Sequence, residues 1–157
     1  MITKTSLLAT RALLYLAKDQ PAIARSPRSI AHQLGESPAY MAKVLRSLVK
    51  AGILRAERGS KGGVRLNKRP HAITLLTVVE ACQGAIVGSH CQDIDDAGTT
   101  CAFHKAAVEL HEAIIDVLSQ WNVEQLAKAP GPTKCLPAGP QCMIARFPLS
   151  IGTVGKE

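Results

Sequence analysis

Two cysteines and a histidine lie close together in the second half of the chain. Cys101 follows Cys91 after ten positions, His104 comes three positions later, and His90 precedes the first cysteine. Thiolates and imidazoles are the ligands of zinc and of iron–sulfur clusters. On a helix, Cys101 and His104 would lie one turn apart on the same face. The spacing therefore indicates a metal or cluster site; buried inert cysteines beside a surface histidine are the alternative.

The chain has five cysteines, an odd number. No basic region followed by an apolar stretch marks a secretion signal, so metal binding or redox chemistry is expected rather than a disulfide framework. A thiol switch is the alternative to a metal site, in which Cys91 pairs with Cys101, Cys135 or Cys142 on oxidation. The spacing assigns no role to Cys82, nor a definite one to Cys135 and Cys142.

A second chemistry is indicated by basic residues near the start of the chain. Residues 1–70 carry 14 Lys and Arg against 3 Asp and Glu, whereas residues 71–157 carry 5 against 9. This asymmetry is typical of a basic module that binds a polyanion beside an acidic module with another task. A solvated basic surface is the alternative.

Several of these basic residues have a spacing that suits DNA. Lys43, Arg46 and Lys50 share one face of a helix, and Arg58 and Lys61 lie in a glycine-rich connector. A helix in the major groove reaches phosphates and base edges, and a hairpin reaches the neighbouring minor groove. The residues expected to contact DNA are Ser37, Tyr40, Lys43, Arg46, Lys50, Arg58, Lys61 and Gly62.

Three helices are predicted before this connector. The first spans residues 6–18 with Ser6 as its N-cap, and the second starts at Ser26 or Ser29 and ends at Gly35. The third has Ser37 as its cap and a proline in its first turn, where a missing N–H costs nothing. Its buried face should consist of Met41, Val44, Leu45 and Leu48.

A hairpin is predicted after the third helix. The β-compatible runs 53–58 and 64–67 flank the connector 59–63, which forms a basic tip. Two short helices joined by a tight turn and followed by such a hairpin make a winged helix-turn-helix, whose second short helix enters the major groove.

The second half of the chain is predicted to hold a helix over 73–83, a loop over 84–100 and a long helix over 102–120. Apolar residues in the long helix follow the two-position heptad seam of a helix that packs along a partner helix. A helix that covers its own domain is the alternative. The seam consists of Phe103, Ala107, Leu110, Ile114, Val117 and Trp121.

The fold class expected from these elements is mainly α with a small β-hairpin wing. Residues 1–72 form the winged helix-turn-helix domain, 73–128 the linking helix, cysteine-bearing sensor loop and dimerisation helix, and 129–157 a flexible tail rich in Pro and Gly. No run of eighteen apolar residues occurs, so we expect a soluble cytoplasmic protein without membrane contact. No nucleophile–base pair, phosphate-binding loop or paired carboxylates indicate an enzyme.

In these stretches the chain resembles the Rrf2 superfamily of dimeric winged-helix regulators, which includes IscR, NsrR and CymR. The resemblance covers about residues 3–128. It is carried by the Leu- and Ala-rich first helix, Ile30–Leu34, Ser37–Tyr40, Leu48–Leu54, Arg58–Gly63, Ile73–Val79 and Cys101–His104. It implies that the long helix crosses to the other subunit and that cysteines of the preceding loop hold an iron–sulfur cluster, as in cluster-binding members.

The chain departs from that pattern in three places. Cluster-binding members usually have three loop cysteines, and here only Cys91 and Cys101 match. The N-terminal carboxylate that some relatives use as a ligand is absent, and the wing has Ser60 and Lys61 where a proline is usual. Beside Cys91, Cys101 and His104, the fourth ligand would come from His32, whose position resembles one used by a variant branch, or from His90, Cys82 or a tail cysteine.

Three hypotheses follow. The first is a homodimeric regulator that binds a palindromic operator in double-stranded DNA and senses redox state, nitric oxide or iron–sulfur status through a [2Fe–2S] cluster. The second keeps the DNA binding but replaces the cluster with a thiol–disulfide switch. The third is a repressor without a cofactor that is regulated by a protein partner, such as a cysteine-biosynthesis enzyme, as in some family members.

Overall fold

The computed structural model describes residues 2–18, 23–59, 62–86 and 102–128. This part is mainly helical with one two-stranded hairpin, as predicted. None of its helices is long and apolar enough to span a lipid bilayer. The elements are α1 (Lys4–Lys18), α2 (Pro27–Leu34), α3 (Pro38–Lys50), β1 (Leu54–Glu57), β2 (Gly63–Leu66), the short 3-10 helix η1 (Pro70–Ala72), α4 (Leu75–Gln83), α5 (Ala102–Gln120) and α6 (Val123–Lys128).

The first helix starts earlier than predicted. Ser6 does not cap it: α1 begins at Lys4, and Ser6 is buried in its first turn. Thr3 occupies the capping position, because the Ser6 N–H donates to Thr3 Oγ1 at 3.2 Å and the Thr3 N–H donates to Ser6 Oγ at 2.8 Å. These reciprocal bonds satisfy two of the free N–H groups at the helix start.

The second helix ends where predicted, at Gly35, and the third begins at its predicted cap, Ser37. The Ser26 hydroxyl accepts from the Ser29 N–H at 3.1 Å, so Ser26 rather than Ser29 caps α2. Gly35 ends that helix with φ 66°, in the left-handed region that glycine adopts without strain. The predicted face of α3 is buried and forms the centre of the core with α1.

The hairpin is fastened to the segment that enters α2. Val64 exchanges two backbone hydrogen bonds of 2.9 Å with Arg25, which therefore lies beside β2 as a third, one-residue strand. A side chain at Gly63 has no room here, since a Cβ would lie 2.3 Å from the Arg25 carbonyl oxygen. The wing is thus held against the helical body at its base.

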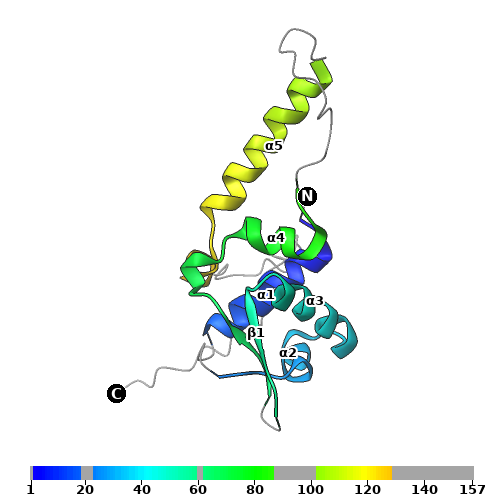
Figure 1. Ribbon diagram of the computed structural model, residues 1–157, viewed down its shortest axis with the longest axis vertical. Coiled ribbons are helices and arrows are strands. Elements are labelled where there is room, and N and C mark those ends of the chain that lie inside the picture. Colours follow the sequence, from blue (N-terminus) through cyan, green and yellow to red (C-terminus); the bar gives the residue numbers. More distant parts are fainter. Residues whose placement is uncertain (1, 19–22, 60–61, 87–101, 129–157) are drawn as a thin grey trace, which may run out of the picture.

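The long helix α5 is anchored at its C-terminal end and stands away from the body at its N-terminal end (Figure 1). The Leu75 N–H donates to the Trp121 carbonyl at 2.8 Å, and the Val123 N–H donates to the Ile73 carbonyl at 2.9 Å. The chain then turns into α6, an element absent from the prediction, whose fully buried Val123 joins the core beside α1. The base of α5 is therefore part of the body that carries the winged helix-turn-helix.

Candidate nucleic-acid interface and sensor segment

The exposed face of α3 is basic. Met41, Val44, Leu45 and Leu48 bury the opposite face, so helical geometry turns Lys43, Arg46 and Lys50 to solvent, where all three are exposed. A free basic helix face of this kind can enter a groove of DNA and reach phosphates and base edges.

Two other residues expected to contact DNA serve the protein itself. The Ser37 hydroxyl accepts from the Tyr40 N–H at 3.1 Å as the cap of α3. Tyr40 is half-buried, and its hydroxyl lies 2.9 Å from Thr5 Oγ1 on α1. This bond fastens the first turn of α3 to α1, a role that helical spacing alone could not reveal. DNA contact by Ser37 and Tyr40 stays a prediction.

The wing presents Arg58 to solvent, whereas Gly62 lies in the tight turn. A Cβ at Gly62 would lie 2.5 Å from the Glu57 carbonyl oxygen, so that position also requires glycine. Lys61 lies outside the described residues. Arg65 is paired with Glu57 across the hairpin and is therefore a weaker attractor for phosphate than Arg58.

Four exposed basic residues near the helix-turn-helix were not predicted individually. The charge asymmetry of residues 1–70 had counted them, but no periodic spacing distinguishes them. They are Arg28 on α2, Arg55 on β1, and Lys68 and Arg69 after β2. They add exposed positive charge on α2, on β1 and after β2.

Below the turn between α2 and α3 lies a buried arginine. Arg11 on α1 is 7% exposed, and its guanidinium donates to the Leu34 carbonyl at 3.0 Å and to Glu36 Oε1 at 3.4 Å. A charged donor to a buried carbonyl forms one of the stronger hydrogen bonds in proteins. Arg11 therefore ties α1 to the turn that sets the angle of α3.

Of the candidate cofactor ligands, the structure describes His32, Cys82 and His104 and does not bring the three together. Cys91, Cys101 and His90 lie outside the described residues, as do the tail with Cys135 and Cys142. His104 is half-buried in the first turn of α5, and His32 is exposed on α2. These two helix segments lie at opposite ends of the molecule in Figure 1. Within the described ranges, no three metal-binding side chains form a group.

Cys82 on α4 does not have the properties of a reactive thiolate. Its side chain is half-buried beside the core, and this burial raises the pKa of the thiol because it disfavours the charged form. The thiol therefore stays protonated near neutral pH, which makes it a poor nucleophile and a poor metal ligand.

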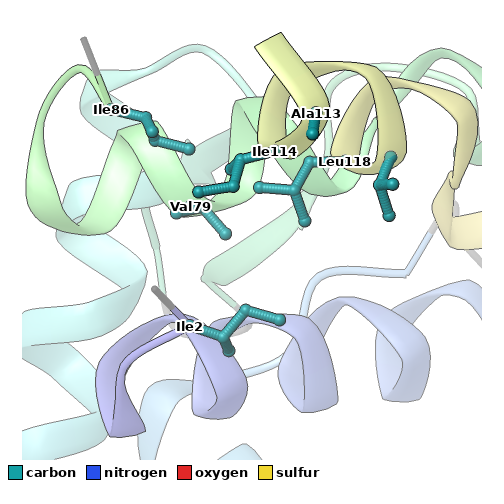
Figure 2. Close-up of a pocket in the computed structure, with 7 residues that line it drawn as sticks. Ile2, Val79, Ile86, Ala113, Ile114 and Leu118 are labelled. Carbon is teal, nitrogen blue, oxygen red and sulfur yellow. The ribbon is translucent and has the colours of Figure 1, made fainter. Parts of the chain in front are cut away.

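The predicted seam of α5 is a solvent-exposed apolar stripe. Phe103 is 78% exposed, Leu110 63%, Val117 54% and Trp121 45%. Near the base of the helix this stripe borders an apolar cavity between α4 and α5 (Figure 2). An apolar stripe of this extent is typical of an interaction surface.

Comparison with known proteins agrees with this architecture. The profile of the Rrf2 family, described as "Iron-dependent Transcriptional regulator", matches residues 2–129. Protein aau3 of Rhizobium meliloti is 31% identical over 136 residues, which cover 82% of this chain and 85% of that protein. The HTH-type transcriptional regulator IscR of Vibrio campbellii is 32% identical over 101 residues, which cover 63% of this chain and 60% of IscR.

A solved structure supports the fold. The structure of CymR (YrzC), the global cysteine regulator of B. subtilis, has a TM-score of 0.68 at 23% identity and covers 83% of this chain and 98% of CymR. The family profile and IscR are described as regulators of transcription, and CymR shares the fold. The chain therefore belongs to the Rrf2 family of DNA-binding transcriptional regulators, and it is not an enzyme.

Proposed function

We propose that this regulator is a homodimer that binds a palindromic operator. The observation that carries the proposal is the apolar stripe of α5, which stays largely exposed, most of all at Phe103 and Leu110. Each Å² of apolar surface that Phe103 and Leu110 leave in water costs about 25 cal/mol of free energy. A second copy packed on the stripe would remove this cost. Two linked helix-turn-helix units read twice as many base pairs as one, at half-sites one or more helical turns apart.

The DNA face of each copy combines α3 with the wing. Lys43, Arg46 and Lys50 would lie in the major groove, while Arg58 and Lys61 would reach the neighbouring minor groove. Ser37, Tyr40 and Gly62 belong to the same face as residues that shape it. Such a regulator works in the compartment that holds the DNA, which we propose is the cytoplasm.

The test combines sedimentation with DNA binding. The protein is offered a random pool of duplexes, and the selected duplex is compared with one from which a half-site has been removed. We expect a dimer, inverted half-sites, and an affinity that falls steeply with salt because counterions are released. A monomer that binds one half-site as well as two would contradict the proposal.

Arginine variants test the placement of the DNA face. Arg46→Ala and Arg58→Ala should each weaken binding, and loss of one phosphate contact should reduce the salt slope by about one. Lys105→Ala removes the same charge from the exposed far end of α5 and serves as the matched control. Equal affinities for all three variants would refute the assignment.

We further propose that the segment leading into α5 senses redox state, nitric oxide or iron–sulfur status with a [2Fe–2S] cluster. The chemical types of these side chains suit such a cluster. Cys91 and Cys101 would supply thiolates. His104, the one of the three that the structure describes, would supply an imidazole from a half-buried position. When bound, such a cluster supplies electron transfer and reaction with oxidants. Within one copy, α2 with His32 lies at the opposite end of the molecule from the start of α5 (Figure 1), so His32 would serve as the fourth donor only from the partner copy.

The visible spectrum of protein purified without oxygen tests this part, with iron and sulfide assays. Absorbance between about 320 and 460 nm that disappears in Cys91→Ala, Cys101→Ala and His104→Ala is expected for a thiolate-ligated cluster. The control is Cys82→Ala, which should keep its colour because that thiol is protonated and packed beside the core. A colourless, iron-free protein would favour a thiol switch or a partner-regulated repressor.

A further inference from the structure

The solvent-facing side of α3 carries one row of exposed residues. Its members share a helix face because they follow each other at intervals of four, three and four residues. From the N-terminal end, the row consists of Ala39, Lys43, Arg46 and Lys50. It therefore begins with a methyl group and continues with three cations.

The first turn of α3 is held firmly in place. The Ser37 hydroxyl caps it, and the Tyr40 hydroxyl lies 2.9 Å from Thr5 Oγ1 on α1. Ala39 lies between these two fastened residues, and such support keeps a recognition site in one geometry. In a helix-turn-helix, the N-terminal residues of the second helix contact the base edges. Ala39 and Lys43 are therefore the members of the row that can read bases.

The other two members lie farther along the helix. At 1.5 Å per residue, Lys43 is about 6 Å from Ala39, whereas Lys50 is about 17 Å from it. The major groove is about 12 Å wide. With the N-terminal end of α3 in the groove, Arg46 and Lys50 approach the phosphates at its edge, where they contribute affinity but no sequence information.

The chemistry of Ala39 and Lys43 limits the base edges that they can bind. In the major groove, guanine presents two acceptors, O6 and N7, and thymine presents a methyl group. Adenine and cytosine each present an amino group, which needs an acceptor on the protein. The Lys43 ammonium only donates, and none of the ion pairs among the described residues involves it. The Ala39 methyl offers apolar contact alone.

The oxygen acceptors at the start of α3 are already used within the protein. Glu36 is ion-paired with an arginine of α1 at 3.4 Å, and the Ser37 hydroxyl accepts from the Tyr40 N–H at 3.1 Å. The Tyr40 hydroxyl is bonded to a threonine of α1. The remaining side-chain oxygen of residues 36–50 belongs to Ser47, which is half-buried in the C-terminal half of the helix. The row therefore favours guanine and thymine over adenine and cytosine.

We propose that Lys43 and Ala39 set the sequence specificity of this regulator. Lys43 binds O6 and N7 of a guanine, and Ala39 contacts the methyl group of a thymine. Their separation of about 6 Å along the helix corresponds to two base steps of about 3.4 Å, so the two bases lie within two steps of each other in each half-site. This assignment rests on the proposed DNA face and names the bases that it reads.

Base analogues in the selected operator test both contacts with the protein unchanged. Each guanine of one half-site is replaced in turn by 7-deazaguanine, which lacks N7, and each thymine by uracil, which lacks the methyl group. We expect one guanine at which the analogue weakens binding of the full chain about tenfold. Within two steps of it, uracil at one thymine should weaken binding about fourfold, the effect of one buried methyl group. Inosine at the same guanine is the control, because it keeps O6 and N7 and should bind unchanged.

Protein variants connect each base to its side chain. The loss with 7-deazaguanine should disappear in Lys43→Ala, and the loss with uracil should disappear in Ala39→Gly. Each is a ratio of two affinities of the same variant, so a loss of stability cancels. Lys43→Gln should select adenine at that position, because a glutamine amide binds N6 and N7 of adenine. Lys50→Ala is the matched control, which should weaken binding to every duplex alike and keep both analogue effects.

Other outcomes overturn the proposal in distinguishable ways. A loss with 7-deazaguanine that persists in Lys43→Ala and disappears in Arg46→Ala means that Arg46 reads the guanine. Selected half-sites without a guanine, or uracil duplexes bound as tightly as thymine duplexes at every position, refute the base assignment. In these cases the inverted half-sites and the proposed function stand. A protein that binds all duplexes alike overturns the base assignment together with the proposed function.

Discussion

Replacement of Arg11 by methionine should destabilise the chain and loosen the helix-turn-helix. Methionine keeps the length and apolar stem of the side chain but donates no hydrogen bond. The interactions then lost include the bond to the Leu34 carbonyl at 3.0 Å and the ion pair with Glu36 at 3.4 Å. Their sizes differ for a physical reason, so a second variant can separate them.

The hydrogen bond to the Leu34 carbonyl should account for most of the lost stability. Leu34 is buried, and a buried acceptor that loses its donor costs about 1–3 kcal/mol. The Glu36 side chain is 34% exposed, and such pairs contribute less than about 1 kcal/mol. Arg11→Met should therefore lower the free energy of unfolding by about 2 kcal/mol, and Glu36→Gln by less than about 0.5 kcal/mol.

Urea unfolding followed by circular dichroism measures both variants, at one fixed protein concentration because dimerisation adds to stability. Arg11→Lys is the matched control, since it keeps the charge and one donor and should lie between wild type and Arg11→Met. An equal loss in Glu36→Gln and Arg11→Met would refute the reasoning, because the ion pair would then be the main tie.

Three further predictions concern the wing, the cap of α3 and Cys82. Gly63→Ala should destabilise the chain by more than Gly35→Ala in the same urea assay. A Cβ at Gly63 meets the Arg25 backbone, whereas a Cβ at Gly35 has open space and only an unfavourable φ. The reverse order would contradict the packing of the wing. Ser37→Ala should cost about 1 kcal/mol by removing the hydroxyl that accepts from Tyr40, and Ser37→Thr should lose less. Cys82 should react with iodoacetamide at pH 8.5 more slowly in folded than in urea-unfolded protein, because burial raises its pKa; equal rates by mass spectrometry would place the thiol in solvent.

The elements that sequence analysis predicted are those with local signals. Caps and apolar periodicity are properties of neighbouring residues, so α2, α3 and α5 were located close to their true ends. The short α6 was missed because six residues show little periodicity. A signal was present, since the Asn122 and Gln125 side chains exchange reciprocal bonds of 2.9 Å with each other's backbone N–H groups, as in a capping box.

The features that could not be predicted depend on contacts between distant residues. Tyr40 shares the solvent-facing side of α3 by helical spacing, but its partner Thr5 is 35 positions away. In the sequence, Arg11 looks like an ordinary surface cation in an apolar helix. Its burial could not be predicted, because the Leu34 carbonyl that it binds is 23 positions away.

The anchoring of α5 connects the proposed sensor segment to DNA binding. The helix has 19 residues, so it is about 28 Å long, and its base is hydrogen-bonded to the body at Ile73 and Leu75. In the proposed homodimer, a tilt of about 10° between the paired α5 helices moves each body by about 5 Å relative to the far end of its helix. Base pairs are stacked about 3.4 Å apart, so this movement exceeds one base-pair step. A recognition helix displaced by that amount no longer faces its half-site while the other half-site is bound, and the operator loses the affinity that comes from binding both halves at once.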